Sequence, residues 1–104
     1  MPIRHVTSQS KLDKIIDKYE KVVIKFSGNF CTPCKQIAPL YKSLSDTYTE
    51  AVFVEIDVEK ADQSINQQYK VSGIPLFVSI KNGNVVDHFT GANQDKLKQM
   101  ISTL

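Results

Sequence analysis

Hydrophobic and polar positions along this chain show two periodicities, one of two residues and one of about 3.6 residues. Short apolar or alternating runs predict strands, because successive strand side chains point to opposite faces. Strands are therefore expected at Ile3–Val6, Val22–Phe26, Ala51–Val58, Leu76–Ile80 and Val85–Phe89. The last two flank Lys81-Asn82-Gly83-Asn84, and Asn-Gly is the strongest short signal for a hairpin.

Apolar positions three and four residues apart predict helices between these strands. Ser8 is a suitable N-cap for a helix that runs to about Tyr19. Further helices are expected from about residue 31, over Ala61–Tyr69 and over Gln94–Leu104, and Pro39 should kink the second helix. The apolar positions that carry the longer patterns are Leu12, Ile15, Ile16, Ile37, Leu40, Tyr41, Leu44, Tyr48, Leu97, Met100, Ile101 and Leu104.

The resulting order of elements is β-α-β-α-β-α-β-β-α. Strands that alternate with helices imply parallel pairing through right-handed crossovers, and the late hairpin adds antiparallel strands. We therefore expect an α/β fold in which a central mixed five-stranded sheet is flanked by four helices. A chain of 104 residues without a linker or repeat is expected to form a single domain over residues 1–104.

Composition excludes several classes of protein. The hydrophobic fraction of 41% and the charged fraction of 23% are ordinary for a globular domain. A net charge of +2 is too small to favour nucleic acid or an anionic membrane as a partner, and the apolar runs are too short to span a bilayer. The N-terminus has no apolar signal-peptide core, which favours a cytoplasmic location. A removed leader and unconventional export are left open.

The candidate chemistry lies at Cys31 and Cys34, which are the only cysteines. They are separated by two residues, where the strand Val22–Phe26 gives way to a helix. A helix N-terminus presents unpaired N–H groups and the positive end of the dipole, and both stabilise a thiolate. The thiolate is the nucleophile in disulfide exchange. The pair therefore indicates a reactive dithiol.

Other interpretations of these residues carry less weight. A zinc site generally requires four ligands, and His5 and His88 are the only histidines, neither of them expected near the cysteines. No metal is therefore expected. An inert structural disulfide is disfavoured by the position at a helix start and by a cytosolic setting. Pro75, taken alone, would simply mark the beginning of a strand.

These residues and their surroundings carry a resemblance. The chain resembles the thioredoxin family over nearly its whole length. The matching pieces are Phe26, Cys31-Thr32-Pro33-Cys34-Lys35, Pro39, Asp57, Val71-Ser72-Gly73-Ile74-Pro75, Lys81-Asn82-Gly83 and Gly91-Ala92. The resemblance implies a protein thiol–disulfide oxidoreductase without a bound cofactor. Its partners would be disulfide-containing proteins and a separate reductase that supplies electrons, and the protein is expected to be a monomer.

The resemblance also implies roles for individual residues. Cys31, at the exposed mouth of the helix, would attack a substrate disulfide, and Cys34 would resolve the mixed disulfide to leave a Cys31–Cys34 disulfide. Pro33 suits the first helical turn because it lacks an N–H. Pro75 would be cis, would face the dithiol and would leave the preceding backbone free to pair with an extended substrate segment. The residues expected to form a small apolar docking collar are Phe30, Gly73, Ile74 and Ala92.

Several residues near the dithiol depart from the family pattern. Phe30 stands where Trp is usual and Thr32 where Gly is commonest, so that a β-branched side chain stiffens the helix start. The positions after the strand carry Ser27 and Gly28 in place of an aromatic residue and Ala, and Leu76 stands where Thr is usual after the proline.

The largest departure is Lys25, at a position that usually carries a buried Asp that takes the proton of the second cysteine. One hypothesis is an exchanged pair, in which Glu55 on the neighbouring strand accepts the proton and Lys25 favours the Cys34 thiolate. The alternative is that Lys25 extends to solvent with only its stem packed.

Two further functions stay open at this point. Thr32 and the missing Asp could destabilise the disulfide and make the protein a more oxidising thiol oxidase or isomerase. A thioredoxin-like binding module or subunit with secondary redox activity is the third possibility, but such a role would require neither cysteine.

Overall fold

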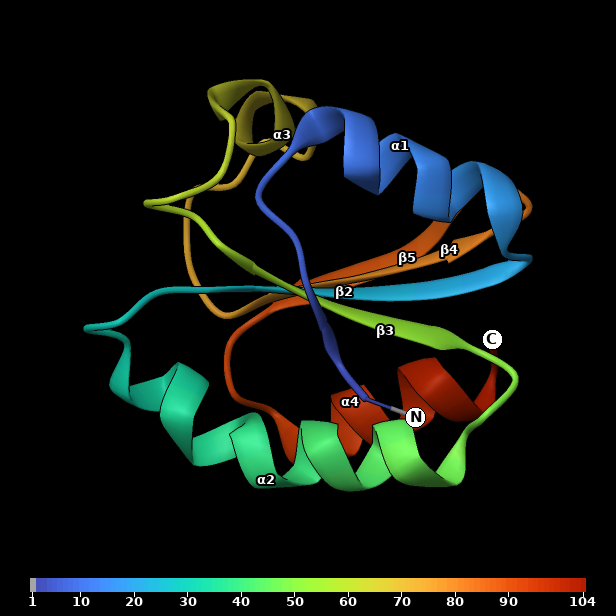
Figure 1. Ribbon diagram of the computed structural model, residues 1–104. Coiled ribbons are helices and arrows are strands. Elements are labelled where there is room, and N and C mark those ends of the chain that lie inside the picture. Colours follow the sequence, from blue (N-terminus) through green and yellow to red (C-terminus); the bar gives the residue numbers. More distant parts are fainter. Residues whose placement is uncertain (1) are drawn as a thin grey trace.

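A central sheet separates two layers of helices in the computed structural model, which describes residues 2–104 (Figure 1). Helices α1 and α3 cover one face of the sheet, and α2 and α4 cover the other. This confirms the predicted mixed α/β architecture. The elements are β1 (Arg4–His5), α1 (Gln9–Lys18), β2 (Lys21–Ser27), α2 (Thr32–Thr47), β3 (Val52–Asp57), α3 (Gln63–Gln68), β4 (Leu76–Lys81), β5 (Asn84–Thr90) and α4 (Gln94–Ser102).

The 5-stranded sheet has the order β1-β3-β2-β4-β5. Strands β1, β3 and β2 run parallel, whereas β4 pairs antiparallel with β2 and with β5. The β4–β5 hairpin turns at Asn82 and Gly83, which both have positive φ angles, of 52° and 80°. Two consecutive positive φ angles are what a tight hairpin turn requires, and this is why the Asn-Gly pair occurs there.

The central strand β2 is apolar almost throughout because helices cover both of its faces. Val22, Ile24 and Phe26 are fully buried on the face covered by α1 and α3, where they belong to one hydrophobic cluster with Leu12 and Ile65. Val23 points to the opposite face, toward α2 and α4. The cluster on that face also contains Ile37, Tyr41, Phe53, Phe77, Leu97, Met100 and Ile101. Each such buried side chain stabilises the fold by roughly 1.5–3 kcal/mol.

Helix starts and ends follow local signals in the sequence. Ser8 is the N-cap of α1 as expected, and its side chain accepts a hydrogen bond of 3.3 Å from the Lys11 N–H. Pro39 lies inside α2. Helix α3 is shorter than the predicted Ala61–Tyr69, because Ala61 still belongs to the turn that follows β3, where its N–H donates to the Asp57 carbonyl oxygen. Leu104 lies beyond the end of α4 and is half-buried.

Within residues 2–104, none of the helices has both the length and the apolar character needed to cross a membrane.

Candidate active site

The N-terminus of α2 is built around Cys31, which is its N-cap. Strand β2 ends at Ser27, and the chain turns so that the Cys31 N–H donates to the Gly28 carbonyl oxygen at 3.2 Å. The Cys31 Sγ accepts a hydrogen bond of 3.1 Å from the Cys34 N–H. Pro33 occupies the first turn, where its missing N–H breaks no helical hydrogen bond. The helix start therefore aims a backbone N–H at the Cys31 sulfur.

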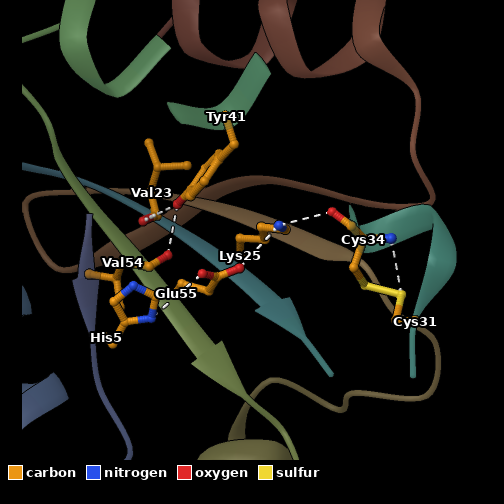
Figure 2. A network of polar contacts seen from close by, with 8 residues as sticks. All are labelled: His5, Val23, Lys25, Cys31, Cys34, Tyr41, Val54 and Glu55. Atoms are coloured by element: carbon orange, nitrogen blue, oxygen red, sulfur yellow. Dashed lines mark hydrogen bonds and ion pairs between the residues drawn. A yellow bond between two sulfur atoms is a disulfide. The ribbon is translucent and has the colours of Figure 1, made fainter. Parts of the chain in front are cut away.

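Cys31 and Cys34 are joined by a disulfide, with their Cα atoms 5.2 Å apart (Figure 2). In this oxidised form Cys31 is 8% exposed and Cys34 is 1% exposed. Cys31 is therefore the more accessible of the two residues, but it is less exposed than its expected position at the start of the helix implies. The neighbouring Phe30 is 91% exposed and is the most exposed large hydrophobic residue within residues 2–104.

The segment before β4 lies beside the cysteine loop. Antiparallel pairing of β2 with β4 sets Phe26 opposite Leu76, so the residues after Phe26 and before Leu76 meet at this end of the sheet. A Cβ atom added to Gly28 would lie only 3.1 Å from the Ile74 Cδ1. The Ile74–Pro75 peptide bond is cis, as the resemblance implies.

The other residues of the predicted collar lie around the same segment. Gly73 sits against Thr90, since an added Cβ would come within 3.2 Å of the Thr90 Cγ2. The Gly91 N–H donates to the Pro75 carbonyl oxygen at 2.8 Å, which ties the chain before Ala92 to the cis-proline. Pro75 is buried, while Gly73, Ile74 and Ala92 are half-buried, and Thr32 is exposed at the helix start.

Lys25 and Glu55 form an ion pair beside Cys34. They are register partners on β2 and β3, with the Lys25 Nζ 3.0 Å from the Glu55 Oε2. The Lys25 side chain is 2% exposed, so the alternative in which it extends to solvent is wrong. It stays inside because β2 is the central strand and α2 covers the face on which Lys25 lies. Glu55 is 23% exposed.

The Lys25 ammonium also reaches the second cysteine. Its Nζ donates a hydrogen bond of 3.1 Å to the Cys34 carbonyl oxygen, and Figure 2 shows this nitrogen between the Glu55 carboxylate and Cys34. Opposite charge and a carbonyl dipole therefore both act on the buried cation. This arrangement matches the geometry, though not yet the role, of the exchanged pair in the sequence hypothesis.

Tyr41 completes this buried polar cluster and was expected only as a core residue. The Lys25 Nζ lies 5.8 Å from the centre of its ring. The Tyr41 hydroxyl lies 2.7 Å from the Val54 carbonyl oxygen and 3.2 Å from that of Val23. Burial, followed by the negative charge of Glu55, raises the pKa of Tyr41 well above the ordinary tyrosine value. Helical spacing from Ile37 gave the only sequence signal for this residue, and spacing does not reveal polar contacts.

Glu55 connects this cluster to the surface. Its Oε1 lies 3.6 Å from the Nδ1 of His5, whose side chain is 74% exposed. Glu55 also lines an open hollow of about 400 Å³ at the ends of the parallel strands. Other residues that line this hollow are His5, Ser27, Gly28, Asp57 and Lys60.

The described residues hold no group of three or more His, Cys, Asp or Glu side chains that could bind a metal ion. His5 lies on β1 and His88 on β5, which are the two edges of the sheet.

A mixed sheet with a disulfide at the N-terminus of a covering helix, beside a cis-proline loop, defines the class of thiol–disulfide oxidoreductases. Comparison with known proteins identifies the family. The thioredoxin family model matches residues 3–103. Thioredoxin 1 of Plasmodium falciparum is 40% identical over 99 residues, which cover 95% of this chain and 94% of that protein. Human thioredoxin is 40% identical over 96 residues, which cover 92% and 89%.

Solved structures agree with these relatives. A structure of P. falciparum thioredoxin has a TM-score of 0.92 at 40% identity and covers 97% of this chain and 98% of that one. Fasciola hepatica thioredoxin has a TM-score of 0.91 at 34% identity, with coverage of 97% and 98%. The chain belongs to the thioredoxin family and is a thiol–disulfide oxidoreductase. The fold, family and class of reaction that the sequence predicts are confirmed.

Proposed function

We propose that this protein reduces disulfides in protein substrates, with Cys31 as the nucleophile and Cys34 as the resolving cysteine. The observation that carries this assignment is the hydrogen bond of 3.1 Å from the Cys34 N–H to the Cys31 Sγ. A helix N-terminus that points a donor at one sulfur stabilises negative charge on that sulfur. Cys31 is also the less buried of the two cysteine residues.

The reaction balances in two exchanges. The Cys31 thiolate attacks a substrate disulfide, which forms a mixed disulfide and releases one substrate thiolate. The Cys34 thiolate then attacks the Cys31 Sγ, which releases the second substrate thiolate and closes the Cys31–Cys34 disulfide. Two electrons pass from the cysteine pair to the substrate, and the two released thiolates take up the protons that the cysteines lost.

Substrates are proposed to dock beside the disulfide on the collar of Phe30, Gly73, Ile74 and Ala92. An extended substrate segment would pair with the backbone before Pro75, as an added strand does. Phe30 offers an exposed aromatic surface next to Cys31. Thr32, the exposed residue between Cys31 and Pro33, would narrow the approach to the sulfur from the helix side.

A separate reductase is proposed to return the disulfide to the dithiol, because the reaction consumes one reduced pair per turnover. A reducing compartment such as the cytosol suits a protein that depends on this recycling. The protein is proposed to act as a monomer that forms transient mixed disulfides with its partners.

Turnover of insulin disulfides with dithiothreitol as the electron source tests this function. Wild-type protein should accelerate the reduction, and Cys31→Ser should abolish the acceleration. Cys34→Ser should accumulate a mixed disulfide at Cys31 that reducing agent releases. Absence of turnover, or a Cys31→Ser variant as active as wild type, would reject the proposal and favour a binding module.

The direction of the reaction is decided by the reduction potential. A buried cation beside Cys34 stabilises a thiolate relative to the disulfide, which makes the pair more oxidising. This observation favours the oxidase or isomerase as the second candidate. Equilibration with glutathione measures the potential: a value near that of protein disulfide isomerase, at about −180 mV, would support the second candidate, and one near about −270 mV would support the reductase.

A further inference from the structure

Lys25 brings a positive charge into the interior beside Cys34. Its side chain is 2% exposed, and its Nζ donates to the Cys34 carbonyl oxygen at 3.1 Å. Transfer of an ammonium out of water costs several kcal/mol unless partners compensate. A lysine that served only to fill this space could be replaced by an apolar side chain at no such cost. The retained charge therefore calls for a physical role.

The groups around Lys25 compensate the buried ammonium. From β3, Glu55 supplies a carboxylate oxygen at 3.0 Å, and from β1, His5 faces the far oxygen of Glu55. From α2, the Cys34 carbonyl accepts a hydrogen bond and the Tyr41 ring lies 5.8 Å away. From β4, the register partner is the apolar Phe77. Glu55 is thus the only acidic side chain among these contacts.

The order of these groups matters for proton transfer. Lys25 contacts both Glu55 and Cys34, and Figure 2 shows its nitrogen between them. The carboxylate is already engaged by the ammonium and turns its other oxygen toward His5 and the open hollow. Both carboxylate oxygens thus face groups other than Cys34. The cation, by contrast, lies next to the cysteine that must ionise.

We propose that Lys25 is a positioning residue that stabilises the Cys34 thiolate in the resolving step, while Glu55 compensates the buried Lys25 ammonium and is not the acceptor of the Cys34 proton. This inference rests on the proposed roles of Cys31 and Cys34. In the step itself, the Cys34 thiol gives its proton to water, and its thiolate attacks the Cys31 Sγ. The bond from Cys31 to the substrate breaks, and the released substrate thiolate takes a proton from water. The protein then needs no internal base, because proton release and uptake balance.

The first measurement is the ionisation of Cys34 alone. In a Cys31→Ser background, the ultraviolet absorbance of the thiolate is followed against pH. Lys25→Met removes the charge and keeps an unbranched stem, so the titration midpoint should rise by about one pH unit or more. Lys25→Arg keeps a cation that stays charged at any working pH and should return the midpoint toward that of wild type.

The control for burial is Lys35→Met, which removes an exposed lysine adjacent to Cys34. Solvent screens that charge, so its loss should shift the midpoint far less than loss of Lys25. An equal shift in the two variants would overturn the assignment to Lys25. So would an unchanged midpoint in Lys25→Met.

The second measurement separates resolution from attack. Reduced protein with both cysteines reacts with an aromatic disulfide that releases a coloured thiolate in two phases, first on attack by Cys31 and then on resolution by Cys34. Below the wild-type midpoint, Lys25→Met should slow the second phase about threefold to fourfold for each unit of midpoint shift, because the loss of thiolate is partly offset by the higher nucleophilicity of a more basic thiolate, and the first phase should change less. A loss confined to the first phase would overturn the proposal.

The role of Glu55 is tested in the Lys25→Arg background, where the residue at position 25 stays positively charged at any working pH. The double variant Lys25→Arg with Glu55→Gln cannot lose its cation, and it should resolve as fast as Lys25→Arg alone. A clearly slower second phase in the double variant, with circular dichroism unchanged, would make Glu55 the proton acceptor and overturn the proposal. Because the Cys34 titration needs no substrate, its result stands apart from any failure of wild-type protein to reduce insulin.

Discussion

Lys25 and Glu55 face each other across two parallel strands, as register partners whose Nζ and Oε2 atoms lie 3.0 Å apart. The pair is asymmetric, because the lysine side chain is 2% exposed whereas the glutamate side chain is 23% exposed. Water can therefore solvate part of the anion but little of the cation. The stability of the cation depends on Glu55 more than the anion depends on Lys25.

Glu55→Gln should therefore destabilise the fold by about 1–3 kcal/mol, since it leaves a buried ammonium beside a neutral amide. Urea unfolding at neutral pH measures the change. Glu50→Gln is the matched control, because Glu50 is 76% exposed and lies 3.8 Å from Lys21 in a surface ion pair. That control should change stability by less than about 0.5 kcal/mol. Equal effects of the two substitutions would contradict the view that Glu55 compensates a buried charge.

Tyr41 should make the protein sensitive to alkali. Burial and the charge of Glu55 raise its pKa well above the ordinary tyrosine value, so above about pH 10 the folded state binds more protons than the unfolded state. This contribution to stability is complete below that pH and is lost as pH rises further. Tyr41→Phe should reduce the alkaline loss, at a cost near neutrality of about 1–2 kcal/mol for the missing hydroxyl contacts.

The measurement is the free energy of unfolding from neutral to alkaline pH, and Tyr19→Phe serves as control. A hydrogen bond from Arg4 lowers the pKa of Tyr19, which gives its titration the opposite sign. Removal of Tyr19 should therefore leave the alkaline loss in place. If Tyr41→Phe lost stability with pH as steeply as wild type, Tyr41 would not be the source.

The structural features that were predicted correctly are those that depend only on a few neighbouring residues in the sequence. The Asn82-Gly83 turn, the Ser8 cap and the dithiol at the start of α2 each follow from local backbone preferences. The mix of parallel and antiparallel pairing followed from the alternation of strands and helices and from the late hairpin, whereas the spatial order β1-β3-β2-β4-β5 was not predicted. The pairing of Lys25 with Glu55 was also expected, but from the resemblance to the thioredoxin family rather than from local backbone preferences.

The features that sequence could not decide depend on segments distant in the chain. Whether Lys25 reaches solvent is settled by the cover that α2 provides, and the sequence of β2 does not contain that information. Tyr41 shows only the spacing of a core residue, although its hydroxyl bridges β2 and β3. The low exposure of Cys31 in the disulfide form was likewise not predicted, because it depends on how the neighbouring loops pack.

Phe30→Ala should weaken docking of protein substrates without weakening the fold. The side chain is 91% exposed, so its removal should change stability by less than about 0.5 kcal/mol. If it contacts substrates, the KM for insulin should rise by about fivefold to thirtyfold, as for loss of an aromatic contact of about 1–2 kcal/mol. A small aromatic disulfide should react at the wild-type rate. The control is Val86→Ala, at an exposed position on β5, which should change neither the KM for insulin nor the rate with the small disulfide. An unchanged KM for insulin in Phe30→Ala would show that Phe30 does not belong to the docking collar.

Gly28→Ala should alter substrate docking through Ile74. The added Cβ would lie 3.1 Å from the Ile74 Cδ1, which is the flexible end of a side chain that can move by a few tenths of an ångström. Stability should change by less than about 1 kcal/mol, whereas the displaced Ile74 should raise the KM for insulin. The double variant Gly28→Ala with Ile74→Val lacks the Ile74 Cδ1 and therefore has no clash. A KM that returns toward the value of Ile74→Val alone would assign the effect to the clash, and a KM that stays high would assign it to the methyl group added at position 28 acting on the cysteine loop.

Gly83→Ala should affect stability and leave substrate docking unchanged, which is the opposite of the effect expected for Gly28→Ala. Gly83 has a φ of +80° and no atom within 4 Å of an added Cβ, so the substitution strains the backbone of a hairpin turn and touches nothing else. It should cost about 1 kcal/mol of stability and leave the KM for insulin unchanged. Paired measurements of unfolding free energy and KM should therefore separate the two glycines, with Gly28→Ala changing mainly KM and Gly83→Ala mainly stability. If Gly28→Ala instead lost stability and kept its KM, the contact with Ile74 would serve the packing of the loops and not the docking of substrates.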